Sequence, residues 1–178
     1  MRMQPAQMEH YPKDWQRQNC PHTAAETNED KAPPALTESS PRPYALLNSG
    51  VVVLHPSREA FEDIYRFLAS PQVKEYCFPD QDLLAEYFKG RWKPLPWYYN
   101  GLKTLRAIHP GLWSDDEVRC VHYILKDKPW TMRPEAEKLP DYRVVSQWWW
   151  DVFEELRAEM ADQDPEGLAL VDSLVAPA

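Results

Sequence analysis

A histidine and a lysine close together in the sequence are the first side chains that could do chemistry. His122 lies in the apolar stretch VRCVHYI, and Lys128 follows in HYILKDKPW. A neutral imidazole is a good ligand for a divalent metal, and an ammonium group can hold a phosphate. A core histidine bonded to the backbone, beside a solvated lysine, is the structural alternative. The pair indicates either a metal-assisted phosphate site or an ordinary buried strand, and both remain open on these residues alone.

Two carboxylates, Asp80 and Asp82, flank Gln81 in the motif FPDQD. Carboxylates so spaced could chelate a cation through oxygen ligands. The same residues open an expected helix, where Asp is favoured because it accepts backbone N–H groups and suits the positive end of the helix dipole. A second Asp-Gln-Asp, at 162–164, lies in an acidic stretch and indicates that the pattern arises readily. The spacing of Asp80 and Asp82 is therefore compatible with chelation of a cation and with capping of a helix.

Amides, hydroxyls and aromatic rings that could contact a sugar lie in two further motifs. Asn48 and Ser49 precede the apolar run VVVL, where an amide and a hydroxyl can bond sugar hydroxyls, although such residues also make plain turns. The segment WKPLPWYYN ends at Asn100 and carries rings with flat apolar faces. Such rings stack on sugars but also fill cores, so neither motif decides its own function.

Several well-known catalytic motifs are absent from the sequence. It contains no G-x-S-x-G, no P-loop, no H-E-x-x-H and no G-x-G-x-x-G. Cys20, Cys77 and Cys120 form no C-x-x-C pair, and the Cys20-Pro21-His22 tripeptide has no second half for a zinc site. We therefore expect free thiols in a reducing compartment.

Charge and composition restrict the partners. The 178 residues carry a formal charge of −8, which argues against nucleic acid and anionic membranes, because both need a basic surface. A nucleotide ligand is still compatible, since one lysine and a metal can hold it. The 18 prolines against 5 glycines favour stiff loops over glycine-rich phosphate cradles. No apolar run approaches the ~20 residues of a membrane span, so we expect a cytoplasmic protein.

Composition divides the chain into three segments. Residues 1–43 are polar and rich in proline, and we expect an irregular or disordered segment, except that Tyr11 and Trp15 could anchor onto a neighbouring surface. Residues 44–131 are the densest in apolar periodicity and form the expected core. Residues 132–178 comprise an expected amphipathic helix and an acidic tail.

The first half of the core segment predicts a strand followed by a helix. Residues 51–54 are apolar, three of them β-branched valines, and the run ends before Pro56, which is typical of a buried strand. Ser57 is an expected N-cap, with Glu59 in the first helical turn. The helix ends before the Ser-Pro pair at 70–71. Its apolar stripe consists of Phe61, Ile64, Tyr65 and Leu68.

The second half predicts a helix over 81–89 that Gly90 stops, and a buried strand over 118–124. Strand, helix, helix and strand in this order favour an α/β layer arrangement. A long amphipathic helix is expected after the break at Pro140, with the Trp148–Trp150 run in its packing face. We expect a frayed end beyond it.

In this order the motifs resemble the second half of family 8 glycosyltransferases, the group that contains glycogenin and the plant galactinol synthases. The resemblance runs from about residue 44 to residue 130 and rests on LNSGVVVLHPS, FPDQDLLAEYF, WKPLPWYYN and VHYILKDKPW. HYPKDWQRQNC and QWWWDVFEEL are similar, more loosely, to parts of fungal glycogenin-like members.

The resemblance implies a partial nucleotide-diphospho-sugar transferase fold of the GT-A-like α/β class, without its N-terminal nucleotide-binding half. It also implies a retaining hexose transfer from a UDP-hexose, with Mn²⁺ or Mg²⁺. By the same resemblance His122 is a metal ligand and Lys128 binds the donor diphosphate, while Asp80 is the nucleophile or stabilises the cationic transition state. The remaining residues contact the donor sugar or line its pocket: Asn48, Ser49, Gln81 and Asn100.

Two departures from the family pattern put activity in question. The upstream half with its D-x-D metal pair is absent, and Leu125 stands where the family usually has a glycine, three residues after the motif histidine. We expect an incomplete hexosyltransferase domain that acts on a nucleotide sugar and an acceptor. A missing N-terminal lobe or a homo-oligomeric partner would complete it. A catalytically inactive sugar- or nucleotide-binding module is the alternative, and a tryptophan-rich scaffold with accidental motifs is a third. If the resemblance holds, the site residues converge on one cleft.

Overall fold

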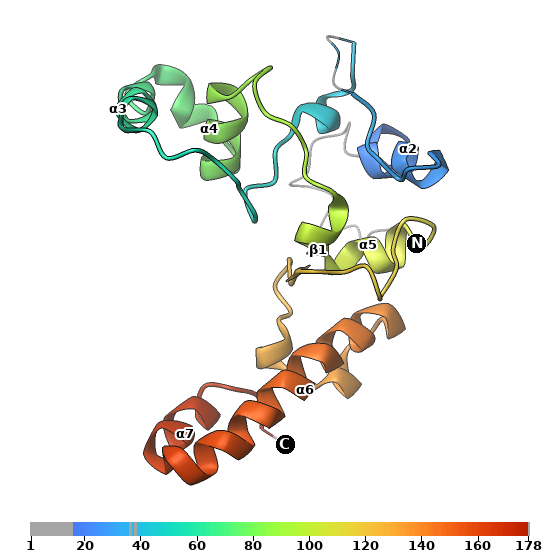
Figure 1. The fold of residues 1–178 in the computed structure, drawn as a ribbon, viewed down its shortest axis with the longest axis vertical. Coiled ribbons are helices and arrows are strands. Elements are labelled where there is room, and N and C mark those ends of the chain that lie inside the picture. The colour runs from blue at the N-terminus through green and yellow to red at the C-terminus, as the bar shows by residue number, and fades with distance from the viewer. Residues whose placement is uncertain (1–15, 36, 38, 178) are drawn as a thin grey trace. The chain divides into compact units, whose positions relative to one another are not determined.

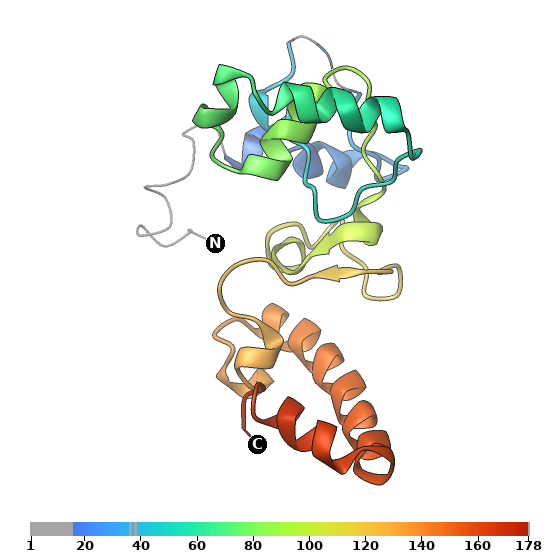
Figure 2. The ribbon, with the colours of Figure 1, turned by 90° about the vertical axis from the view of Figure 1, so that its left-hand side faces the viewer.

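The structure is a computed structural model that describes residues 16–35, 37 and 39–177 of the chain (Figure 1, Figure 2). It divides into two compact units, residues 1–97 and 98–178, and each is described by itself. The anchor predicted at Tyr11 and Trp15 lies outside the described residues. The predicted segment boundaries after residues 43 and 131 stay a prediction.

The first unit consists of short helices. Its elements are η1 (Arg17–Asn19), α2 (Pro21–Thr27), η2 (Arg42–Ala45), α3 (Arg58–Phe67), η3 (Pro71–Glu75) and α4 (Pro79–Tyr87), where η marks a 3₁₀ helix. Helix α2 lies in the stretch where irregular chain was expected. It forms there because Pro21 at its first turn is preorganised for a helix, and because Ala25 on its inner face is buried.

Helix α3 begins where the sequence predicts, because the Ser57 hydroxyl accepts the Ala60 N–H at 3.2 Å. It ends at Phe67, ahead of the Ser-Pro pair. Its ring pair Phe61 and Tyr65 is exposed, at 67% and 70%. Phe67 lies on another side and contacts Tyr87 of α4, with ring centroids 5.9 Å apart.

The buried strand predicted over residues 51–54 is wrong. These residues form no strand, and Val53 and Leu54 are 79% and 58% exposed. A strand needs a neighbour for its backbone N–H and C=O groups. Among the described residues the only sheet lies in the other unit, so this β-branched run has no pairing partner.

Helix α4 begins two residues before the predicted start and ends at Tyr87. The Asp82 carboxylate accepts the backbone N–H groups of Cys77 and Phe78, each at 2.9 Å, and so satisfies donors at the helix start. Gly90 follows the helix end in the left-handed conformation, with φ +71°. The predicted helix and its glycine stop are confirmed.

The second unit is a small parallel βαβ arrangement followed by helices. After η4 (Trp97–Asn100), β1 (Gly101–Leu102) leads into α5 (Lys103–Ile108) and then to β2 (Val121–His122). The two strands pair in parallel, with Gly101 opposite Val121 and Leu102 opposite His122. The strand predicted over 118–124 is therefore much shorter than expected, and it is half-buried.

Gly101 is a position where a side chain would be tightly packed. A Cβ added there would lie 3.2 Å from the Cys120 carbonyl oxygen and 3.3 Å from the Trp113 ring. Because Gly101 also donates its N–H to that same carbonyl at 2.8 Å, the close approach is part of the strand pairing.

The chain continues through η5 (Pro129–Thr131) and η6 (Pro134–Ala136) into α6 (Pro140–Gln163) and α7 (Pro165–Asp172). Trp150, one of the three consecutive tryptophans, is 2% exposed and donates its indole N–H to the Met132 carbonyl at 3.2 Å. Trp149 stacks on Phe153 with ring centroids 4.9 Å apart. The run therefore serves packing, as predicted.

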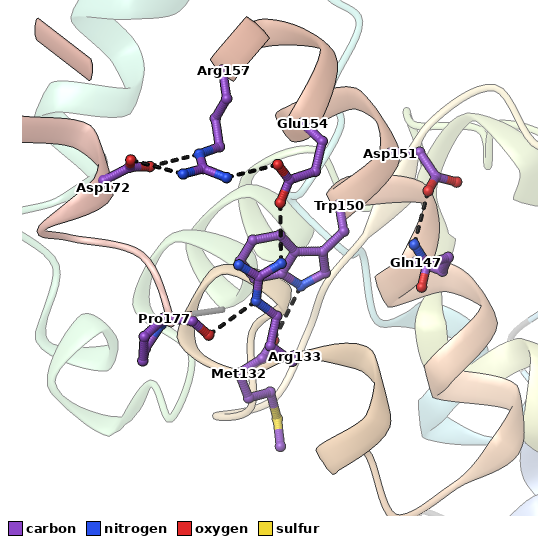
Figure 3. A network of polar contacts seen from close by, with 9 residues as sticks. All are labelled: Met132, Arg133, Gln147, Trp150, Asp151, Glu154, Arg157, Asp172 and Pro177. Carbon is purple, nitrogen blue, oxygen red and sulfur yellow. Dashed lines mark hydrogen bonds and ion pairs between the residues drawn. The ribbon is translucent and has the colours of Figure 1, made fainter. Parts of the chain in front are cut away.

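The frayed end predicted after α6 is wrong, because α7 forms there and folds back beside α6 (Figure 2). Asp164 caps α7 by accepting the Gly167 N–H at 2.9 Å, and Pro165 occupies the first turn. Arg157 of α6 binds Asp172 through two nitrogens, each at 2.9 Å (Figure 3). The sequence signal for this helix was the Asp-Pro-Glu start, which the acidic character of the segment obscured.

A second arginine secures the end of the chain against α6. Arg133 lies over the Trp150 ring at 3.7 Å and donates to Glu154 at 3.1 Å and to the Pro177 carbonyl at 3.0 Å (Figure 3). Across both units, the part of the chain that the structure describes is mixed helix with one small parallel sheet, which is compatible with the α/β class expected from the sequence. None of the helices described here is long and apolar enough to cross a membrane.

The Asp164 cap should contribute to the stability of α7. We expect Asp164→Ala to destabilise this helix by about 1 kcal/mol, because the Gly167 N–H loses its acceptor. Amide hydrogen exchange at residues 167–172 measures the effect. Asp162→Ala, which removes the same charge inside α6, is the matched control and should leave this exchange unchanged. Equal effects of the two substitutions would contradict the capping role.

Candidate functional site

Three predicted site residues come together in the first unit. The Ser49 hydroxyl donates to an Asp80 carboxylate oxygen, and the Ser49 backbone N–H donates to the Gln81 side-chain oxygen at 3.3 Å. The neighbouring Asn48 accepts the Gly50 N–H at 3.0 Å, which shapes the turn. The LNSG turn is thereby joined to the first turn of α4, although the motifs lie about thirty residues apart in sequence.

The two carboxylates of FPDQD have different tasks. Asp82 accepts two backbone N–H groups at the start of α4, so the capping interpretation applies to this residue. Asp80 is exposed and bonds Ser49 instead. That hydroxyl, aided by backbone N–H groups of α4, lowers the pKa of the Asp80 carboxyl. Asp80 is therefore an accessible, ionised carboxylate beside an amide and a hydroxyl.

Asn100 and His122 come together in the second unit. His122 Nδ1 lies 2.9 Å from the Asn100 side-chain oxygen. An amide oxygen can only accept, so Nδ1 carries the proton and Nε2 is the ring's acceptor. The parallel strand pairing fixes this contact, because Asn100 directly precedes β1 and His122 ends β2.

The environment of His122 favours the neutral imidazole. Burial and the positive charge of Lys128 both lower the pKa of this side chain from its ordinary 6.5. A neutral ring whose Nδ1–H is held by an oxygen is the form in which a histidine binds a metal through Nε2. The residues therefore fit one ligand of a divalent ion. Within the described ranges no three His, Cys, Asp or Glu side chains gather closely enough to hold one.

Lys128 stands at the end of a tight loop that begins at Tyr123. Its ammonium donates to the Tyr123 carbonyl, and its backbone N–H donates to the Thr131 hydroxyl at 3.2 Å. An ammonium has three donors, so this bond leaves further capacity for an anion. The loop brings one positive charge close to His122, as the effect of Lys128 on the His122 pKa indicates.

Leu125 within this loop has φ +70°, a backbone conformation that leucine rarely adopts. An L-residue with a Cβ is strained there by roughly 1–2 kcal/mol, whereas glycine is not. The backbone at this position therefore has the conformation that favours glycine, although the residue is leucine. This conformation suits the glycine that the family resemblance leads us to expect at this position.

A buried charged cluster near the loop was missed by the sequence reasoning. Lys103 of α5 and Glu137 are 1% and 4% exposed, and Lys103 Nζ lies 3.8 Å from a Glu137 carboxylate oxygen. Lys103 also donates to the Asp127 backbone carbonyl, immediately before Lys128. A lysine between two leucines was the only local signal, and it does not identify a partner 34 residues away.

The predicted site residues thus form two groups in two units. Asn48, Ser49, Asp80 and Gln81 belong to the first unit, and Asn100, His122 and Lys128 belong to the second. Ser49 contacts Asp80 and Gln81 in the first group, and Asn100 contacts His122 in the second. Their predicted convergence on one cleft, and the role of each residue, stay predictions.

The sequence profile named Glycosyl transferase family 8 matches residues 7–133, well over half of the chain. The chain belongs to this family. The matched region begins before residue 44 and so includes HYPKDWQRQNC, where the resemblance was looser.

Curated relatives agree with this membership. The chain is 30% identical over 128 residues to galactinol synthase 1 of Solanum lycopersicum, which covers 70% of the chain and 39% of the relative. It is 29% identical over 139 residues to galactinol synthase 2 of Arabidopsis thaliana, covering 76% of the chain and 38% of the relative. The chain therefore spans about two fifths of the length of these relatives. No solved structure matches it.

The strain at Leu125 gives a prediction about stability. At an ordinary position alanine is more stable than glycine, but here we expect Leu125→Gly to be more stable than Leu125→Ala by about 1 kcal/mol. The two variants lose the same leucine contacts, so their difference isolates the backbone term. Urea unfolding of both proteins measures it. An alanine variant as stable as the glycine variant, or more so, would contradict the strain.

The electrostatics of His122 give a second prediction. We expect its pKa, followed by NMR titration, to lie below 6.5 and to rise in Lys128→Met, because a nearby positive charge is removed. Lys126→Met, an exposed lysine of the same loop, is the control and should have little effect. Because the folded pKa is depressed, the unfolded chain binds the proton first as pH falls. Stability should therefore decrease from about pH 6.5 down to the folded pKa.

Proposed function

We propose that this protein transfers a hexose from a UDP-hexose to an acceptor, with retention at the anomeric carbon and with Mn²⁺ or Mg²⁺ as cofactor. The hydrogen bond between His122 Nδ1 and Asn100 carries the proposal, because it presents a neutral metal-binding nitrogen in a chain of this family. The galactinol synthase relatives support sugar transfer in general, and the acceptor here is left open.

In the second unit, His122 would hold the divalent ion through Nε2, and Lys128 would hold the donor diphosphate. A divalent ion neutralises the charge that builds on a leaving diphosphate. Lys128 adds a positive charge that acts on His122, and its ammonium donates to the Tyr123 carbonyl. Asn100 sets the direction of the imidazole ring by accepting its Nδ1 proton.

In the first unit, Asp80 would act on the transferred sugar, with Asn48, Ser49 and Gln81 around the donor hexose. The Ser49 hydrogen bond lowers the basicity of the Asp80 carboxylate. A less basic carboxylate is a weaker nucleophile but keeps its negative charge. We therefore favour Asp80 as the group that stabilises a cationic transition state over Asp80 as the nucleophile.

Leu125 favours a second candidate function, a sugar- or nucleotide-binding module without turnover. A leucine side chain stands where the family glycine would let the backbone approach a diphosphate. Leu125 is 37% exposed, in the same loop as Lys128. Binding of UDP without transfer would be the result expected of such a module.

Calorimetric titration with UDP tests the proposal. We expect binding that requires manganese, and we expect His122→Ala to weaken it at least about tenfold, since a ligand side chain is lost. His55→Ala, an exposed histidine of the first unit, is the matched control and should bind like the wild type. Absence of metal-dependent UDP binding in a folded protein would contradict the proposed transferase.

Turnover separates the two candidates. We expect release of hexose from UDP-hexose in the presence of manganese, and its loss in Asp80→Asn with UDP affinity unchanged, because Asp80 acts on the sugar only. Asp116→Asn, an exposed carboxylate of the other unit, is the control. UDP binding with no turnover in the wild type would favour the binding module.

A further inference from the structure

The buried Lys103–Glu137 pair has more partners than an isolated ion pair. Besides Glu137, Lys103 donates to the Asp127 carbonyl and lies 5.0 Å from the centre of the Tyr142 ring. Glu137 in turn accepts the Ser146 hydroxyl of α6 at 3.0 Å. The cluster thus joins the start of α5, the loop before Lys128 and the long helix α6.

Net stabilisation does not explain such a cluster. Removing two charges from water costs several kcal/mol, and replacing a buried ion pair by apolar residues of similar volume is often neutral or stabilising. Burial lowers the pKa of Lys103, and the nearby carboxylate of Glu137 opposes this shift. What the pair supplies is a fixed position for the backbone that Lys103 binds.

That backbone is the loop from Tyr123 to Lys128, which contains the strained Leu125. The loop is attached at its start, where the Tyr123 hydroxyl donates to the Val145 carbonyl of α6 at 2.8 Å. Burial raises the pKa of Tyr123 to about 12, so this hydroxyl remains a donor at neutral pH. The Lys103 bond to the Asp127 carbonyl attaches the other end. Two attachments are needed because the strained residue between them favours another conformation.

Lys103 acts from inside the protein. It is 1% exposed, so its ammonium does not reach a ligand in solvent, whereas Lys128, one residue beyond Asp127, is less buried. Lys103 therefore contacts the loop from the core, whereas the charge of Lys128 is accessible to a ligand.

We propose that the Lys103–Glu137 pair positions the 123–128 loop, and through it the Lys128 ammonium, for the diphosphate of the donor. The inference rests on the proposed function for the identity of the ligand. The positioning of the loop does not depend on the proposed function. Loop position and ligand binding are therefore measured separately.

The double variant Lys103→Met/Glu137→Gln separates positioning from folding. Met matches the length of the lysine stem, and Gln still accepts the Ser146 hydroxyl, so no buried charge is left unpaired. We expect its thermal stability to be close to that of the wild type. Lys103→Met alone should be the less stable of the two, because Glu137 then remains as an uncompensated buried charge.

Two readouts on the double variant test the proposal. Amide exchange of Ile124 and Lys128, whose N–H groups are bonded at 2.9 and 3.2 Å, should become about tenfold faster, as expected for loss of a charged hydrogen bond to the loop. UDP affinity with manganese should also fall about tenfold, while affinity for uridine, which has no phosphate, should not change. Wild-type exchange at both amides would overturn the positioning role.

The readouts also distinguish the two levels of the proposal. Faster loop exchange together with equal losses for UDP and uridine would overturn the link to the diphosphate. If the wild type binds no UDP, the proposed function fails, and the exchange experiment still decides whether the pair positions the loop.

Discussion

The parallel pairing of β1 with β2 is the constraint on which the second unit depends. It is only two residues long on each strand, and it requires Gly101 to pass within hydrogen-bonding distance of the Cys120 carbonyl. Because of this register, Asn100 and His122 lie side by side. A Cβ at position 101 would press on the Cys120 carbonyl and the Trp113 ring at 3.2 and 3.3 Å, so this glycine lets the strand before His122 approach closely.

The 123–128 loop follows directly from this pairing. It leaves β2 at His122, turns through a residue with a left-handed backbone, and ends at the buried Pro129 that begins η5. A glycine would make the turn without strain, and with leucine the neighbouring elements must hold it. The buried Lys103 of α5 donates to the Asp127 carbonyl, and the Tyr123 hydroxyl donates to the Val145 carbonyl of α6. These two hydrogen bonds are the contacts by which we propose that the loop is positioned.

Sequence reasoning predicted best what depends on nearby residues. The Ser57 cap of α3 and the end of α4 near Gly90 follow from local backbone chemistry, and both were found. The buried strand at 51–54 failed because strand formation depends on a partner that periodicity does not reveal. Helix α7 was missed although its Asp164 start was readable, because the acidic composition of the segment outweighed the cap.

In the candidate site, too, local signals were readable from the sequence and long-range contacts were not. Spacing alone left His122 and Asp80 undecided between structural and chemical roles, and it was the family resemblance that assigned partners to them. The structure adds the contacts of Ser49 with Asp80 and of Asn100 with His122. Lys103 and Glu137 had no usable signal, since an ion pair between distant residues becomes visible only once the chain is folded.

We propose that Asn100 presents His122 as a neutral ligand for a divalent ion beside the donor diphosphate. NMR of the ring nitrogens of His122, with manganese added in the absence and presence of UDP, tests it most directly. We predict a proton on Nδ1, none on Nε2 at neutral pH, and strong paramagnetic broadening of the His122 ring when manganese and UDP are both present. A protonated Nε2, or a His122 signal that manganese and UDP leave sharp, would contradict the claim.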